Sequence, residues 1–200
     1  MKEQIYDWTV RMGISLLRSV FPEFYAKDPL TPTDRYIEYP FVLSKLPKVQ
    51  AKVLDVGCAG SMLPLLIQSL GHKVIGTDIR DYEGDVWFLK EDICHSTLDS
   101  NSVDIITCVS TIEHIGLEGR YGASSKSSDF SALTSMMRIL KPFGLLLMTV
   151  PFGEKYEVTK FHRIYDKEKL DNLLLGYTYN CQIVPSPEAE YSLALITAMK

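Results

Sequence analysis

Short apolar segments alternate along this 200-residue chain with segments whose apolar residues recur at helical spacing. The apolar segments are rich in β-branched residues, which is typical of strands buried in a parallel sheet. Helical spacing is clear over residues 62–70, 129–140 and 167–175. Together these patterns predict an α/β fold. The strand patterns cover residues 51–56, 73–77, 86–93, 105–110, 145–150, 180–184 and 192–199.

The residues before the first strand predict a helical segment. Residues 3–21 place apolar side chains near one face of a helix, and Pro22 ends it. An irregular stretch with three prolines follows, and a short helical pattern covers residues 41–46. With 46% hydrophobic and 23% charged residues, the chain fits one globular domain. We therefore expect a single domain over residues 1–200, made of an N-terminal helical cap segment at 1–48 and a core at 49–200.

Residues 51–61 join a predicted strand to a helix through a turn that reads Gly57-Cys58-Ala59-Gly60. Glycine has no Cβ, so the backbone can turn sharply and a ligand can approach the N–H groups of the helix start. The three spaced glycines of a dinucleotide-binding turn are missing. Asp55 stands just before the turn, and a carboxylate there suits a ligand that carries an ammonium group better than one that carries a pyrophosphate.

The string Val53-Leu-Asp-Val-Gly-Cys-Ala-Gly60 closely resembles motif I of the class I S-adenosylmethionine (SAM)-dependent methyltransferases. The resemblance implies a three-layer Rossmann-like sandwich, whose seven-stranded, mostly parallel sheet ends in an antiparallel C-terminal hairpin. It also implies SAM as cofactor, S-adenosylhomocysteine as product, and direct displacement at the sulfonium methyl. The cofactor loop would consist of Asp55, Gly57, Cys58, Ala59 and Gly60. The alternative is an ordinary strand–turn–helix in an unrelated α/β protein.

Two further acids follow later strands of the predicted sheet. Asp78 ends the second strand pattern, 18 positions after Gly60, where an acid in nucleotide-binding βαβ folds binds the ribose hydroxyls. Ile79 would then flank the adenine. The resemblance gives Asp92 a role at the adenine amino group and places the backbone of Ile93 near the ring. Asp92 could instead start a turn or cap a helix.

The string Ser110-Thr-Ile-Glu-His-Ile-Gly116 follows the fourth strand, at the sheet edge where open α/β folds bind ligands. It again resembles the class I methyltransferases, and we count Ser110 among the cofactor-binding residues. His114 is a candidate general base because its reference pKa lies near neutrality. Alternatively, Glu113 and His114 only shape the pocket. His162 is a second catalytic candidate, because the string from His162 to Tyr165 is similar to a cluster that borders the acceptor pocket in related transferases; a structural role is the alternative.

Two other segments could complete the pocket. In the resembled family the segment before motif I often caps the cofactor, so Arg35 could pair with the cofactor's carboxylate; packing on the sheet is the alternative. Residues 116–128 are rich in glycine and serine, which is typical of a mobile loop over an acceptor site. Glu113, His114 and His162 could together bind a divalent metal, but three ligands are few for such a site, and we predict no metal.

The remaining features bear on partners and location. The net charge of −4 argues against nucleic acid, which usually needs a basic surface. The chain has no room for a separate substrate domain, so we expect a small-molecule or sugar-like acceptor. Alternatives are an RNA- or protein-directed methyltransferase, a catalytically silent SAM-binding subunit, and a nicotinamide-dependent oxidoreductase. Four widely spaced cysteines predict neither disulfides nor a zinc site. No segment has the form of a signal peptide or membrane span, so we expect a cytoplasmic protein.

Overall fold

The computed structural model describes residues 33–117, 121 and 127–200. Residues Thr33–Lys200 form one compact unit, which is the subject of the following description. The helix predicted over residues 3–21 and most of the predicted loop at 116–128 lie outside the described residues. The division into a cap at 1–48 and a core at 49–200 therefore stays a prediction. No helix in the described part of the chain is both long and apolar enough to cross a membrane.

Seven strands form one mixed sheet in the order β3-β2-β1-β4-β5-β9-β8. The parallel part consists of β3 (Trp87–Lys90), β2 (Lys73–Asp78), β1 (Lys52–Val56), β4 (Val103–Val109) and β5 (Leu140–Phe152). The hairpin of β8 (Thr178–Pro185) and β9 (Ser192–Met199) joins antiparallel to β5. The predicted seven-stranded, mostly parallel Rossmann-like sheet with an antiparallel C-terminal hairpin is confirmed.

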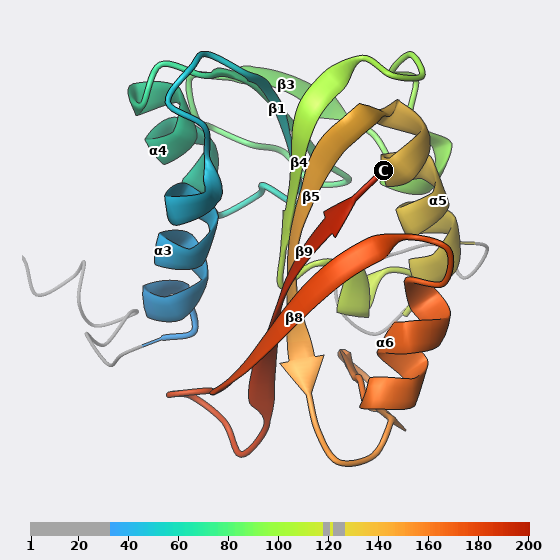
Figure 1. Cartoon of the computed structure of the whole chain (residues 1–200). Coiled ribbons are helices and arrows are strands. Elements are labelled where there is room, and N and C mark those ends of the chain that lie inside the picture. Colours follow the sequence, from blue (N-terminus) through green and yellow to red (C-terminus); the bar gives the residue numbers. More distant parts are fainter. Residues whose placement is uncertain (1–32, 118–120, 122–126) are drawn as a thin grey trace, which may run out of the picture. The chain divides into compact units, whose positions relative to one another are not determined.

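Helices cover both faces of this sheet. Figure 1 shows α3 (Arg35–Lys45) and α4 (Leu63–Ser69) on one side, and α5 (Asp129–Ile139) and α6 (Lys167–Leu173) on the other. A hydrophobic core lies on each face of the sheet. Successive residues of the central strands point to opposite faces and therefore pack in different cores. Val53 packs in the core that includes Ile67 of α4, whereas Leu54 packs in the core that includes Met136 of α5. The three layers predicted from the sequence are therefore present.

Several short elements lie beyond the carboxyl ends of the parallel strands. Asp92 caps a single 3₁₀ turn, η1 (Ile93–His95), and a second, η2 (Ile112–His114), follows β4. A two-stranded ribbon of β6 (Glu157–Val158) and β7 (Arg163–Ile164) follows β5. The chain order reverses between β1, which pairs with β2, and β4. In doubly wound sheets ligands bind at such a reversal, outside the carboxyl ends of the strands.

Three local predictions differ from the structure. Helix α3 begins at Arg35 and runs through Pro40, although an irregular stretch was expected before residue 41. An interior proline costs a helix about 3 kcal/mol, and the burial of Glu38 and Val42 against the rest of the unit offsets that cost. Helix α5 ends at Ile139, one residue before the predicted end at 140, because Leu140 already begins β5. Strand β5 begins at Leu140 and not at 145, because Leu140 already pairs with Val103 before the register shifts.

Candidate functional site

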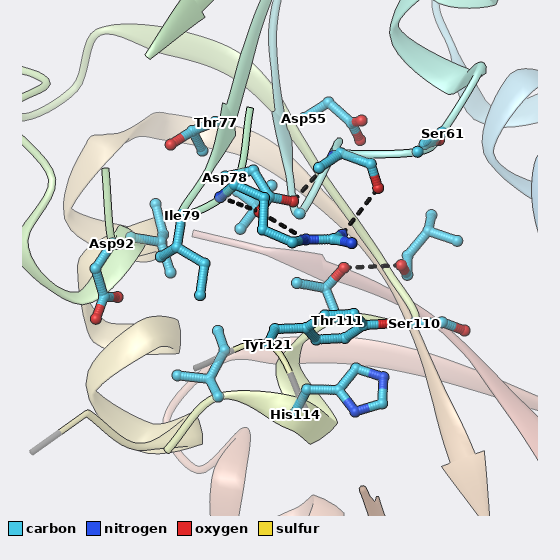
Figure 2. Close-up of a pocket in the computed structure, with 18 of the residues that line it drawn as sticks. Asp55, Ser61, Thr77, Asp78, Ile79, Asp92, Ser110, Thr111, His114 and Tyr121 are labelled. Atoms are coloured by element: carbon cyan, nitrogen blue, oxygen red, sulfur yellow. Dashed lines mark hydrogen bonds and ion pairs between the residues drawn. The ribbon is translucent and has the colours of Figure 1, made fainter. Parts of the chain in front are cut away.

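A cavity of about 340 Å³ opens at the carboxyl ends of β1, β2 and β4. Its lining includes His114 and every residue of the predicted cofactor set except Cys58. Figure 2 shows the side chains of Asp55, Asp78 and Asp92 around this cavity, with Tyr121 and His114 below Asp78 in that view. Among the described residues, the lining holds four carboxylates, Asp55, Asp78, Glu91 and Asp92, and two guanidinium groups, Arg35 and Arg80. Residues far apart in the sequence thus meet in one pocket.

The glycine turn follows β1 directly. Gly57 has φ +80° and donates its N–H to the carbonyl of Thr77 at 2.8 Å. A Cβ on Gly57 would lie 2.2 Å from Oγ1 of Thr111, so only glycine fits between the two loops. Gly60 has φ +77°, and a Cβ built there meets nothing within 4 Å. The backbone at Gly60 is therefore open to a ligand. The side chain of Cys58 is instead fully buried beneath the turn and contacts Gly76.

Asp55 lies at the floor of the cavity and is 2% exposed. Its Oδ1 accepts a hydrogen bond from Thr107 Oγ1 at 2.5 Å. Burial raises the pKa of Asp55 to about 7, because the charged form loses its hydration; the bond from Thr107 and the charge of Arg35 oppose that rise, and Asp78 adds to it. A cationic group in the cavity would therefore interact strongly with this carboxylate.

Asp78 joins the end of β2 to the glycine turn. Its Oδ2 accepts from the backbone N–H of Ala59 at 2.9 Å, and its Oδ1 accepts from the backbone N–H of Arg80 at 2.8 Å. The side chain of Arg80 returns to the same turn, because Nη2 donates to the carbonyl of Ala59 at 2.9 Å. Its guanidinium carbon lies 4.2 Å from the centre of the Tyr121 ring. Two backbone N–H donors thus fix the orientation of the carboxylate that is predicted to bind a ribose.

Asp92 fits both interpretations that the sequence allowed. It lines the cavity, and it also caps η1 by accepting from the backbone N–H of Cys94 at 2.9 Å. Ser127 Oγ donates to its second oxygen at 2.6 Å. Burial alone would raise the pKa of Asp92, but the hydrogen bonds from Ser127 and Cys94 outweigh burial and lower it. The carboxylate is therefore ionised at neutral pH, and Ile93 lines the cavity beside it.

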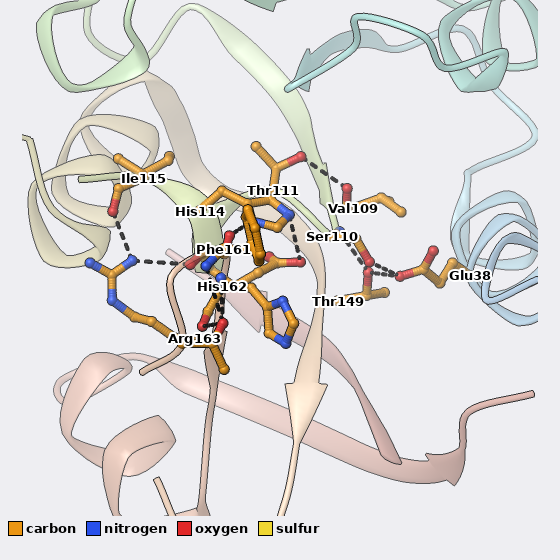
Figure 3. Close-up of polar contacts among 12 residues, drawn as sticks. Glu38, Val109, Ser110, Thr111, His114, Ile115, Thr149, Phe161, His162 and Arg163 are labelled. Carbon is orange, nitrogen blue, oxygen red and sulfur yellow. Dashed lines mark hydrogen bonds and ion pairs between the residues drawn. The ribbon is translucent and has the colours of Figure 1, made fainter. Parts of the chain in front are cut away.

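The two ring nitrogens of His114 face Phe161, after β5, and the neighbouring Glu113. Its Nδ1 lies 2.6 Å from the carbonyl of Phe161, and since a carbonyl can only accept, Nδ1 carries the proton. Its Nε2 lies 3.7 Å from Oε1 of Glu113. Arg163 Nη1 donates to the carbonyls of Ile115 at 2.7 Å and Glu113 at 3.2 Å, which fixes the turn around His114 (Figure 3).

His162 takes a different place from the other candidate residues. Its ring centre lies 6.3 Å from that of His114 and 5.9 Å from that of Tyr191, both in edge-to-face orientation. It does not line the cavity. Within the described part of the chain, no group of three or more His, Cys, Asp or Glu side chains has the geometry to hold a metal ion. His162 therefore packs behind the cavity wall, next to His114.

Glu38 is a prominent residue of the site that was not among the residues predicted from the sequence. It is fully buried on α3 and accepts hydrogen bonds from Arg35, Ser110 and Thr149. Arg35 itself lines the cavity. The pair is spaced three residues apart, as in a helical ion pair, but the expectation of irregular backbone before residue 41 hid that signal. Once α3 is known to begin at Arg35, the acid is a natural candidate.

Comparison with protein families places residues 88–196 in the family described as "Caenorhabditis protein of unknown function, DUF268". The match covers more than half of the chain. The chain belongs to the DUF268 family. The matched span begins in β3 and ends in β9, so it contains Asp92, Ser110, His114 and His162 but not the glycine turn or Asp78. Membership in DUF268 carries no activity with it. No curated protein matches the sequence.

Solved structures with the same fold are far more informative than this family. A Burkholderia thailandensis 1,6-didemethyltoxoflavin-N1-methyltransferase, crystallised with 1,6-didemethyltoxoflavin and S-adenosylhomocysteine, aligns with a TM-score of 0.64 at 16% identity, over 98% of this chain and 89% of that one. A SAM-dependent methyltransferase from Methanosarcina mazei aligns with a TM-score of 0.60 at 16% identity, over 81% and 97%. The cyclase SpnF aligns with a TM-score of 0.65 at 15% identity, over 82% and 80%. This DUF268 chain therefore has the class I SAM-methyltransferase fold.

Proposed function

We propose that the protein binds SAM and transfers its methyl group to a small-molecule or sugar-like acceptor. The observation that carries the proposal is the convergence of Asp55, Gly60, Asp78 and Asp92 on one cavity at the reversal point of the sheet. These residues come from three different strand ends, and each has the chemistry that one part of SAM requires. The fold likeness to SAM-dependent methyltransferases supports the same conclusion. The fold alone does not decide the reaction, because the cyclase SpnF shares it.

The donor set fits SAM better than a dinucleotide. Gly60 offers an open backbone surface, and the carboxylate of Asp78 can accept bonds from two ribose hydroxyls at fixed spacing. Asp92 would accept from the adenine amino group beside Ile93. Asp55 lies under the turn where a dinucleotide would carry its phosphates, and a buried carboxylate at that position repels an anion. When bound, SAM would supply an electrophilic methyl on a sulfonium.

His114 would serve as the general base for an acceptor whose attacking atom carries a proton. The Phe161 carbonyl holds the Nδ1–H tautomer, so Nε2 is the nitrogen that takes up a proton. The proximity of Oε1 of Glu113 to Nε2, at 3.7 Å, would stabilise the imidazolium that then forms. Arg163 keeps the turn in place through two backbone carbonyls. His162, behind His114, would orient its ring rather than contact the acceptor.

The size of the pocket, one fold neighbour and the net charge support a small acceptor. The cavity of about 340 Å³ falls at the lower end of the range for small-molecule sites, and SAM would occupy much of it. One fold neighbour is named for the methylation of a small heteroaromatic compound. The acidic net charge of −4 disfavours nucleic acid. The expected cytoplasmic location stays a prediction.

Titration calorimetry with SAM, S-adenosylhomocysteine and NAD tests this proposal. We expect micromolar binding of both adenosyl ligands and no heat from NAD beyond dilution. Binding of NAD without binding of S-adenosylhomocysteine would overturn the proposal and favour an oxidoreductase. A screen of methyl transfer from labelled SAM to small-molecule and sugar pools would then identify the acceptor. Binding of SAM with no transfer to any pool, protein or RNA would instead identify a silent SAM-binding subunit.

A further inference from the structure

The carboxylate of Glu38 ties three elements together at the rim of the cavity. Its Oε1 accepts from Ser110 Oγ, at the end of β4, and from Thr149 Oγ1 of β5 at 2.6 Å. Its Oε2 accepts from Arg35 Nη1 at 2.5 Å, within the same helix. Figure 3 shows Glu38 reaching from α3 toward Ser110 and Thr149. One side chain thus fixes α3 against the strand ends that build the site.

A carboxylate is a costly group to place in that position. The side chain of Glu38 is completely buried, whereas that of its ion partner Arg35 is 43% exposed. Removing a charge from water is unfavourable unless hydrogen bonds and an opposite charge compensate, and an apolar side chain of similar size often stabilises a fold equally well. The three bonds to Glu38 provide that compensation, but they do not explain why the interior holds a charge there.

Two of the three partners of Glu38, Arg35 and Ser110, line the cavity. Arg35 lines it, and the guanidinium has five N–H donors, of which one engages Glu38. The Tyr39 ring lies 6.0 Å from that guanidinium, whose positive charge also acts on the nearby carboxylates of Asp34 and Asp55. Ser110 also lines the cavity and has φ +43°, a left-handed conformation that costs a non-glycine residue free energy. Its backbone N–H donates to Thr149 Oγ1 at 3.0 Å, and its hydroxyl donates to Glu38. Thr149 and Glu38 therefore hold the strained residue from two sides.

We propose that Glu38 is a positioning residue for the amino-acid end of the cofactor. It directs the guanidinium of Arg35 so that the remaining N–H donors serve an α-carboxylate in the cavity, and it keeps Ser110 in its left-handed conformation at the same rim. The inference rests on the proposed binding of SAM. In this inference Glu38 does not contact the ligand. Its loss should weaken binding of the amino-acid end of the ligand and leave binding of the adenosine end unchanged.

Two probes separate the ends of the ligand. S-adenosylhomocysteine carries the amino-acid tail, and 5′-methylthioadenosine has the same adenosine and thioether without that tail. In the variant Glu38→Gln the amide oxygen still accepts from Ser110 and Thr149, but its NH₂ group faces the donors of Arg35 and the ion pair is lost. We expect the affinity for S-adenosylhomocysteine to fall roughly 10- to 100-fold, the value of a charge-assisted hydrogen bond. The affinity for 5′-methylthioadenosine should stay within about twofold.

Two companion variants make the result decisive. Arg35→Lys keeps the positive charge near Glu38 but loses the planar fork, so it should also weaken S-adenosylhomocysteine selectively. Glu168→Gln changes an exposed acid on α6 in the same way, and should leave the affinities for both probes unchanged. Thermal unfolding of each variant reports its fold. If Glu38→Gln and Arg35→Lys weaken both probes equally, or neither probe, Glu38 has only a structural role and the inference fails. If the wild-type protein binds neither probe, the proposed function itself fails.

Discussion

Asp78 and Ala59 are joined by a hydrogen bond of 2.9 Å from the backbone N–H of Ala59 to Oδ2 of Asp78. The bond connects the end of β2 to the turn after β1. The same carboxylate accepts from Arg80 through its other oxygen. The residue proposed to bind ribose is therefore also a structural tie, and its removal has two separable consequences.

Asp78→Ala should abolish binding of S-adenosylhomocysteine and also lower the free energy of unfolding by about 1–3 kcal/mol, because two backbone donors lose their acceptor. His114→Ala should bind the ligand as the wild type does, since its side chain is assigned to the acceptor. Calorimetry and chemical denaturation measure the two effects. Retained binding in Asp78→Ala together with lost binding in His114→Ala would reverse these roles.

Gly57→Ala should destabilise the fold through a steric clash as well as through backbone strain. The new Cβ would meet Thr111 Oγ1 at 2.2 Å, and Thr111 is held by a bond to the carbonyl of Val109 at 2.9 Å. Gly71→Ala is the matched control, because Gly71 has φ +90° but open space around it. We expect a loss of about 1 kcal/mol in the control and at least twice that for Gly57→Ala, measured by urea denaturation. Equal losses would show that Thr111 moves without cost.

The buried carboxyl of Asp55 should make stability and ligand binding depend on pH. Its pKa is raised from 3.8 to about 7 by burial, with the bond from Thr107 and the charge of Arg35 acting in the opposite sense and Asp78 in the same sense. The folded state thus holds a proton that the unfolded state has released between pH 4 and 7. The contribution of Asp55 to stability is fully present below its unfolded pKa and falls by up to about 4 kcal/mol as the pH rises through 7.

Asp55→Asn should remove most of that pH dependence, because the amide keeps the shape of the protonated acid without titrating. Unfolding curves of both proteins between pH 4 and 8 provide the comparison. Binding of a cation-bearing ligand should favour the ionised carboxylate, so S-adenosylhomocysteine should bind more tightly at pH 8 than at pH 6 and release a proton on binding. Calorimetry in two buffers of different ionisation enthalpy measures that proton. An identical pH dependence of stability in both proteins would exclude Asp55 as its source.

Phe143 lies within β5, between the pairing of Leu140 and that of Leu145, in an unfavourable backbone conformation. It has φ +62°, and its side chain is 86% exposed, so the ring gains little from burial. Phe143→Gly should relieve the left-handed strain and stabilise the protein by up to about 1 kcal/mol. Phe143→Ala is the control, since it removes the ring but keeps the Cβ and should not stabilise. A gain in Phe143→Ala equal to that in Phe143→Gly would assign the effect to the exposed ring.

Much of the fold could be predicted from residues whose local and tertiary preferences agree. The apolar runs in β1, β4 and β5 form buried strands, and Pro64 begins α4 as its fixed φ allows. The helix predicted from residue 167 begins there as α6, where Asp166 caps it with a bond from the Lys169 N–H at 2.8 Å. Where the local preference of a residue and its tertiary contacts disagree, the sequence pattern predicts the wrong structure. Pro40 and the surrounding prolines favour irregular backbone, yet α3 forms because its buried residues require it.

The residues of the candidate site also divide into those that the sequence could predict and those that it could not. Acids that follow strands were predictable, since parallel strands end at one edge of the sheet and bring Asp55, Asp78 and Asp92 to the same cavity. The direction of the Cys58 side chain was not, because a turn residue can face either the ligand or the sheet. Glu38 was also beyond reach, since its partners Ser110 and Thr149 lie 72 and 111 positions away in the chain. No local pattern records pairings across such distances.

The most direct measurement is a crystal structure of the protein grown with S-adenosylhomocysteine. The account predicts that the ribose hydroxyls bind the carboxylate of Asp78, that the adenine lies between Ile79 and Ile93, and that the amino-acid tail lies between Asp55 and Arg35. A ligand whose ribose lies away from Asp78, or a diphosphate-bearing nucleotide bound on the turn from Gly57 to Gly60 in its place, would contradict it.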